Sequence, residues 1–90
     1  MAVSKENIQQ VFKEKIAEIS SNVISAEEVI PGSSLSVDYG MDSISTISLI
    51  LEMEDALNIC FDDDDFENID FFSYDQVLNR IIEKVEAVNG

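Results

Sequence analysis

Apolar residues recur at helical spacing near both ends of the chain, which predicts a helix in each place. The first helix is expected over about residues 5–21, after a capping serine at Ser4. Its apolar positions are Ile8, Val11, Phe12, Ile16, Ile19 and Val23. The last helix is expected over about residues 73–86, because Ser73 and Gln76 have the spacing of a capping box. Its apolar positions are Val77, Leu78, Ile81, Ile82 and Val85. Residues 87–90 are expected to fray.

A third helix is expected over about residues 43–57, and it carries two apolar stripes instead of one. We expect the first stripe to face the core; it comprises Thr46, Leu49, Ile50, Met53 and Leu57. The second stripe comprises Ile44, Ile47 and Leu51. Either both stripes are buried in a wide core contact, or the second is partly exposed and docks a partner. In the docking interpretation, Met41 belongs to the same surface, and its acidic rim is supplied by Glu52, Glu54 and Asp55.

The connections are expected to be unequal in length. Residues 22–41 read as a long first loop with a turn cluster at 31–34, and one short turn is expected over 25–28. Such a loop must be pinned to the helices by its own apolar side chains. Acidic residues favour a helix start, so a short helix is expected over 63–68. The fold class is therefore all-α: an up-and-down four-helix bundle of three main helices and one short helix.

Composition limits the partners of this fold. Ninety residues, of which 46% are hydrophobic, suit a single domain over 1–90 with an ordered core over about 5–86. Nineteen acidic residues against five basic ones give a formal charge of −14. That charge argues against nucleic acid and anionic membranes, which need a cationic surface. It favours basic protein partners, although the acidity could also serve solubility alone. We also expect a monomer.

The single cysteine, Cys60, excludes a disulfide within the chain. Because it stands between Ile59 and Phe61, we expect it to be a buried structural thiol. No apolar run approaches the roughly 20 residues of a membrane span, and the first residues lack a signal-peptide core. We therefore expect a cytoplasmic protein.

Candidate chemistry within the chain is sparse. There is no histidine, so the commonest general base is missing, and no Gly-rich phosphate loop or cysteine-based zinc spacing occurs. The aspartate run at 62–65 does not match a calcium loop, because Glu67 and Ser73 occupy the positions that require glycine and glutamate. We expect neither an enzyme nor a dedicated metal site.

The stretch of residues 38–44 suits the attachment of a group to a serine. Asp42 is a good N-cap residue for the helix that follows, and Gly40 can adopt a backbone conformation that a side chain would forbid. Ser43 then occupies the first helical position, with its hydroxyl expected to face water. A phosphate on that oxygen would be stabilised by the dipole and the free N–H groups of the helix N-terminus.

This stretch, Asp38-Tyr39-Gly40-Met41-Asp42-Ser43-Ile44, resembles the attachment motif of acyl carrier proteins, and the similarity extends from about Ile8 to Val85. The resemblance implies that Ser43 carries 4′-phosphopantetheine derived from coenzyme A, whose thiol holds an acyl group as a thioester. It also implies that a phosphopantetheinyl transferase recognises Asp42. Further implied partners are acyl-loading and acyl-processing enzymes with basic docking patches.

The motif Gly40-Met41-Asp42-Ser43-Ile44 is similar to the Gly-x-Asp-Ser-Ile motif that is common in polyketide and nonribosomal peptide carriers. Ser45 and Ser48 stand where fatty-acid carriers often have acidic residues. We therefore expect a freestanding carrier of a specialised polyketide or related pathway, with housekeeping fatty-acid synthesis as the alternative. A hypothesis of another class is an acidic helical adaptor that binds a basic partner without a covalent arm. A further variant is phosphorylation of Ser43 as a switch.

Overall fold

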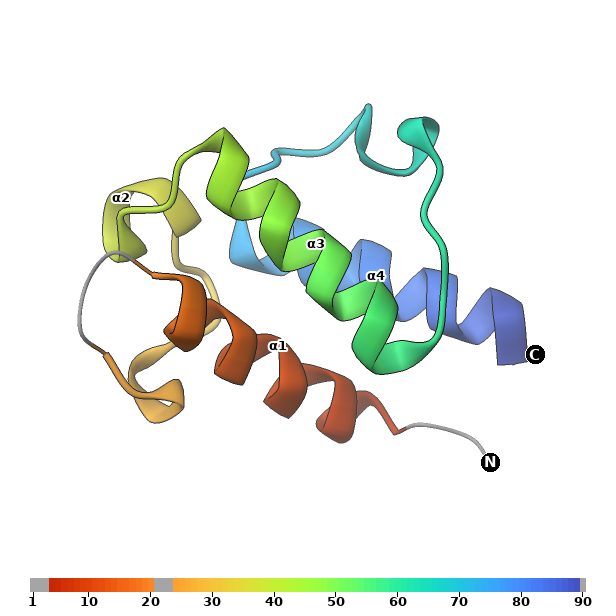
Figure 1. Cartoon of the computed structure of the whole chain (residues 1–90), viewed down its shortest axis with the longest axis horizontal. Helices are drawn as coiled ribbons and strands as arrows, with labels where there is room; N and C mark the ends of the chain where they lie inside the picture. The colour runs from red at the N-terminus through yellow and green to blue at the C-terminus, as the bar shows by residue number, and fades with distance from the viewer. Residues whose placement is uncertain (1–3, 21–23, 90) are drawn as a thin grey trace.

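Three long helices form the frame of the protein (Figure 1). The computed structural model describes residues 4–20 and 24–89. The long helices are α1 (Lys5–Ile19), α3 (Ser43–Leu57) and α4 (Tyr74–Asn89). The shorter elements are the 3₁₀ turn η1 (Ala26–Glu28), the helix α2 (Leu35–Tyr39) and the 3₁₀ turn η2 (Asp63–Phe66). Within the described residues the only β pairing is an isolated bridge between Ser34 and Ser73, so the all-α class is confirmed.

The three long helices do not all alternate in direction. Figure 1 shows α1 running opposite to α3, whereas α3 and α4 run the same way. The expected up-and-down order is therefore wrong between α3 and α4. The reason is the length of residues 58–73, here called the connector, which returns the chain to the side where α3 begins.

The core lies where the predicted apolar stripes of the long helices meet. Ile8, Phe12 and Ile16 of α1 are buried, as are Leu49 and Met53 of α3. From α4 the buried residues are Tyr74, Val77, Leu78, Ile81 and Val85. Thr46 is buried as predicted. Its polar hydroxyl is satisfied there, since it donates to the carbonyl oxygen of Asp42 at 3.0 Å. Val23, the last residue of the predicted α1 stripe, lies outside the described residues.

The helix ends differ from the prediction by a few residues. Helix α1 ends at Ile19 instead of 21, and residues 21–23 lie outside the described part of the chain. At the start of α4, the Gln76 N–H donates to Ser73 Oγ at 3.3 Å. The Gln76 side chain, however, accepts from the Asp70 N–H at 2.9 Å, so the reciprocal bond of a capping box is missing. Helix α4 continues to Asn89, so the expected fraying of 87–89 is wrong; buried Val85 anchors its last turns.

The first loop contains a helix that periodicity did not predict. Helix α2 is only five residues long, too short for an apolar repeat to be visible. Its N-terminus is capped by Ser34, whose hydroxyl accepts from the Val37 N–H at 3.2 Å. Gly40 ends it with a left-handed conformation, at a φ of 66°. The predicted short turn at 25–28 is confirmed as η1.

Tyr39 pins this loop through a closed ring of hydrogen bonds. The Ile30 N–H donates to the Tyr39 hydroxyl at 2.9 Å, and that hydroxyl donates to Ser33 Oγ at 2.8 Å. Ser33 Oγ in turn donates to the Ile30 carbonyl oxygen at 2.6 Å. The Ser20 hydroxyl also donates to the Tyr39 carbonyl oxygen at 2.7 Å, which joins the loop to the end of α1.

Two contacts hold the first half of the connector. The Phe61 N–H donates to Glu54 Oε2 at 2.7 Å, and Lys84 Nζ lies 3.2 Å from Asp65 Oδ2. The expected helix over 63–68 is shorter, a 3₁₀ turn that ends at Phe66. Cys60 is exposed, so its predicted burial is wrong. Its neighbours Ile59 and Phe61 turn inward, and in this non-helical stretch the residue between them faces outward.

Candidate functional site

The turn between α2 and α3 has a fixed geometry. The Gly40 N–H donates to the Ser36 carbonyl oxygen at 3.1 Å, and the Met41 N–H donates to that of Leu35 at 3.0 Å. The Met41 side chain is buried in the core, with 2% of its surface exposed. These contacts leave the chain at Asp42 positioned to begin a helix.

Asp42 caps α3 as predicted. Its carboxylate accepts from the Ser45 N–H at 2.8 Å, and its backbone is extended. The Ser45 N–H is the main cause of a lowered Asp42 pKa, so the carboxylate is ionised at neutral pH. A fixed anionic cap therefore precedes Ser43, which is the first residue of α3 and is exposed.

An exposed serine at this position fits a covalently bound phosphate group. The remaining N–H groups of the first turn and the helix dipole favour a negative charge there. The nearby carboxylate of Asp38 caps a different helix: it accepts from the Ser34 N–H at the start of α2, at 2.7 Å. The described residues next to Ser43 thus supply a hydroxyl, a helix N-terminus and one carboxylate, which is engaged in capping α3.

The second stripe of α3 is exposed. Ile44, Ile47 and Leu51 have exposed fractions of 75%, 50% and 58%, whereas Leu49 and Met53 of the first stripe are fully buried. The interpretation in which both stripes are buried is therefore wrong. An apolar strip begins directly beside Ser43 and follows the helix for two turns.

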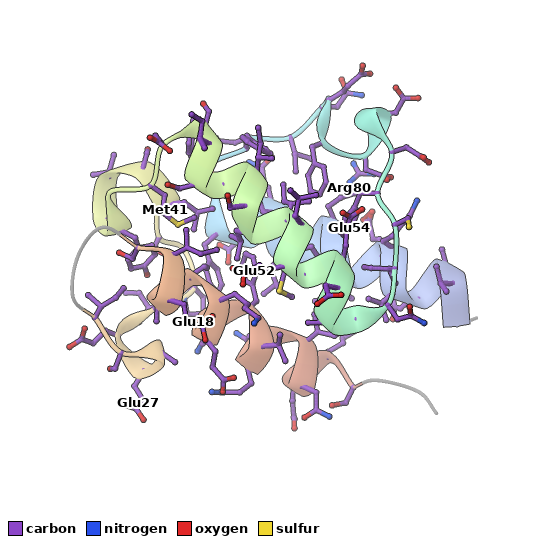
Figure 2. All side chains as sticks on the ribbon, viewed as in Figure 1. Glu18, Glu27, Met41, Glu52, Glu54 and Arg80 are labelled. Carbon is purple, nitrogen blue, oxygen red and sulfur yellow. The ribbon has the colours of Figure 1, made fainter. Side chains whose placement is uncertain are left out.

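The other predicted docking residues are divided by the fold. Met41 faces the core, so the prediction that its side chain belongs to the exposed surface is wrong (Figure 2). Glu52 is half-buried on the side of α3 that faces α1, where Lys15 Nζ lies 3.9 Å from its Oε1. Asp55 is exposed. Of the acidic rim, Asp55 is thus the most accessible to a partner.

A pocket of about 350 Å³ lies between α3 and the connector. Its helical wall comprises Ile47, Ile50 and Leu51. Its opposite wall comprises Phe61, Phe66 and Phe71, which we call the aromatic wall. The carboxylate residues Glu54 and Asp62 complete the lining, and Figure 2 shows Glu54 between α3 and the connector. This pocket was not predicted from the sequence. The signal was the clustering of four of the five phenylalanines at positions 61, 66, 71 and 72.

Neither a metal centre nor a bilayer-spanning helix is found in the described part of the chain. No three Asp, Glu or Cys side chains there gather as potential metal ligands. Within the aspartate run, the carboxylates of Asp62 and Asp65 lie against Lys84 instead, at 3.7 Å and 3.2 Å. None of the described helices has both the length and the apolar character needed to cross a bilayer.

Comparison with known proteins identifies the class of the chain. Residues 9–74 match the family model described as "Phosphopantetheine attachment site". An acyl carrier protein of Desulforapulum autotrophicum is 41% identical over 63 residues, which are 70% of this chain and 80% of that protein. One of Chlorobium phaeobacteroides is 32% identical over 75 residues, covering 81% of this chain and 94% of its own. The chain therefore belongs to the acyl carrier protein family and carries acyl groups on a covalently attached 4′-phosphopantetheine.

Proposed function

We propose that Ser43 is the attachment residue and that residues 1–90 act as a single carrier domain. The observation that carries this proposal is that Ser43 is exposed at the first position of α3, directly after the Asp42 cap. Attachment needs an accessible oxygen and a place where a phosphodiester anion is stable, and a helix N-terminus offers both.

Loading is assigned to a separate transferase with coenzyme A as donor, because the chain has no histidine to serve as the general base. The Ser43 Oγ–phosphorus bond forms as the diphosphate bond of coenzyme A breaks, and adenosine 3′,5′-bisphosphate leaves. The hydroxyl proton passes to a base of the transferase. The bound group then supplies a terminal thiol that holds the acyl chain as a thioester.

The test is intact mass spectrometry after incubation with coenzyme A and a broad-specificity phosphopantetheinyl transferase. We expect a mass gain of one phosphopantetheinyl group, which Ser43→Ala abolishes. Ser48→Ala is a matched control, because Ser48 is also exposed and lies on the same helix. A mass gain in Ser43→Ala, or none in the unmodified sequence, would refute the assignment. The second outcome would favour an acidic adaptor without an arm.

We further propose that Ile44, Ile47 and Leu51 form the partner-docking surface, with Asp55 and Glu52 as its acidic rim. The support is the exposure of all three apolar side chains in a row that starts beside Ser43. The formal charge of −14 favours basic patches on the transferase and on acyl-loading and acyl-processing enzymes. Such charge also speeds encounter, which suits a carrier that visits several enzymes.

Docking is tested with the transferase itself, since the apo-protein bears no acyl group. Leu51→Ala should raise the KM for the apo-protein while changing the free energy of unfolding by no more than about 0.5 kcal/mol. Leu49→Ala, a matched change in a fully buried leucine, should cost about 2–5 kcal/mol of stability. If Leu51→Ala destabilises the fold as much as Leu49→Ala and leaves the KM unchanged, the docking proposal is wrong.

As for the pathway, we propose a monomeric, cytoplasmic carrier of a specialised polyketide or related route rather than of housekeeping fatty-acid synthesis. The supporting feature is the face of α3 near Ser43, where Ser45 and Ser48 are uncharged. Intact mass spectrometry of protein purified from its native host would identify the acyl load. Sedimentation at physiological salt would report the oligomeric state. A straight-chain saturated load shared with bulk lipid synthesis would contradict the specialised assignment.

A further inference from the structure

The pocket between α3 and the connector lies within reach of a group attached to Ser43. Ile47 and Leu51 follow Ser43 by four and eight residues in α3. At about 1.5 Å per residue, they lie roughly 6 Å and 12 Å along the helix axis from it. A phosphopantetheine arm has about fourteen bonds and spans roughly 16 Å, if three bonds extend ~3.4 Å as in a peptide backbone. An acyl group on that arm can therefore enter the pocket.

The wall opposite α3 is built from aromatic rings that stand at steep angles to one another. The ring centroids of Phe61 and Phe66 are 5.0 Å apart with an interplanar angle of 58°. Those of Phe66 and Phe71 are 6.1 Å apart at 72°. All three rings are half-buried, in contrast to Phe12, which is fully buried in the core. Each ring therefore keeps surface that a further ring could contact.

This wall is held in place before any ligand arrives. At one end, the Phe61 N–H donates to Glu54 Oε2 at 2.7 Å. At η2, Lys84 holds Asp65 at 3.2 Å, and the Asp62 N–H donates to Asp65 Oδ2 at 2.6 Å. A preformed wall needs little ordering when it binds a ligand, so more of the contact energy appears as affinity.

The size and charge of the pocket limit which acyl groups can bind in it. Benzene fills an apolar cavity of about 150 Å³ in another protein, so about 350 Å³ holds a phenyl ring with several further carbons. Glu54 and Asp62 add negative charge to the lining. An acyl group with a terminal carboxylate would be repelled by these two side chains, which favours an uncharged ligand.

We propose that the aromatic wall makes this pocket prefer aromatic or conjugated acyl chains over saturated ones of equal carbon number. The inference rests on the proposed attachment at Ser43. Aromatic side chains pair in offset or edge-to-face geometries, which gain attraction beyond area burial. Each such pair is worth a factor of about two to ten in the equilibrium between sequestered and exposed acyl groups.

The test compares two acyl groups with the same number of carbon atoms, nonanoyl and 3-phenylpropanoyl. Each is loaded onto the full chain from its coenzyme A thioester, and loading is verified by intact mass. The rate of thioester cleavage by hydroxylamine is then divided by the rate for the free coenzyme A thioester, which removes intrinsic reactivity. We expect the phenyl-bearing group to be protected about two to ten times more strongly. Amide NMR shifts should change at Phe61, Phe66 and Phe71.

Two variants separate the aromatic wall from general apolarity. Phe66→Leu should abolish the preference for the phenyl group and retain protection of nonanoyl, whereas Phe72→Leu, outside the pocket lining, should retain both. If Phe66→Leu fails to fold, Phe71→Leu takes its place. Equal protection of the two groups in the unmodified sequence, or equal effects of the Phe66 and Phe72 variants, would overturn the proposal. Failure of loading would instead contradict the attachment at Ser43.

Discussion

The hydroxyl of Tyr39 offers the sharpest test of how the long first loop is held. Its side chain is only 4% exposed, and its oxygen accepts from the Ile30 N–H and donates to Ser33 Oγ. Tyr39→Phe removes this one oxygen and keeps the ring that packs in the core. The Ile30 N–H then loses its acceptor, whereas Ser33 keeps its own bond to the Ile30 carbonyl oxygen.

The loss of stability in Tyr39→Phe has two parts, the Ile30 N–H left without its acceptor and the lost hydrogen bond to Ser33 Oγ. An orphaned, partly buried N–H costs about 1–3 kcal/mol, and a lost neutral hydrogen bond about 0.5–1.5 kcal/mol. Because water can reach part of the loop, we expect a loss of about 2 kcal/mol in the free energy of unfolding. For a domain of this size, that lowers Tm by roughly 8–16 °C.

The assay is urea unfolding followed by circular dichroism, with the m-value as a check that the unfolded state is unchanged. Tyr74→Phe is the matched control, because among the described residues the bond recorded for the Tyr74 hydroxyl is one accepted from Gln9 Nε2, at a long 3.4 Å. Its removal should cost less than about 1 kcal/mol. Hydrogen exchange of the Ile30 amide should accelerate only in Tyr39→Phe. Equal losses in both variants, with no local change at Ile30, would refute the reasoning.

Three further predictions concern the helix ends and the connector. Asp42→Ala should lower Tm, and Asp42→Asn should retain most of the stability, because an amide oxygen can still cap α3; equal losses would argue against capping. Burial opposes the ionisation of Asp65, but the Asp62 N–H and Lys84 outweigh it and lower its pKa below the ordinary 3.8. The charged form of Asp65 therefore stabilises the fold above that pH, and the contribution disappears as the pH falls through the lower folded-state pKa. In urea titrations across this acid range, Lys84→Met should make the loss of stability with falling pH shallower; an unchanged slope would argue against the ion pair. Asn58→Ala should cost about 1 kcal/mol because Asn58 has a φ of 55°, whereas Asn58→Gly should cost nothing by the same denaturation assay; equal stability of the two variants would contradict this account.

Features that depend on neighbouring residues in the chain were predictable. The bounds of α3, its Asp42 cap and its core-facing stripe follow from helical spacing and local capping chemistry. Helix α2 was missed although Ser34 and Gly40 bracket it with a cap and a stop, because five residues carry no period. That pair of signals is what could have found it.

Features that depend on distant segments were not predictable in the same way. Exposure of Ile44, Ile47 and Leu51 depends on where the connector passes, and periodicity allowed either outcome. Met41 and Cys60 were assigned from their chain neighbours, and both assignments were wrong because the fold turned one inward and the other outward. The aromatic wall likewise exists only because three side chains spread over residues 61–71 meet one face of α3.

By itself, the sequence determined the helical class, the strong negative charge and a serine at a capped helix start, because these follow from composition and from contacts within a few residues. Tertiary structure decided which face of α3 meets solvent and where a pocket opens. Burial depends on which surfaces pack together, and those surfaces come from distant parts of the chain. For example, the Leu35 N–H donates to the Phe72 carbonyl oxygen at 2.6 Å.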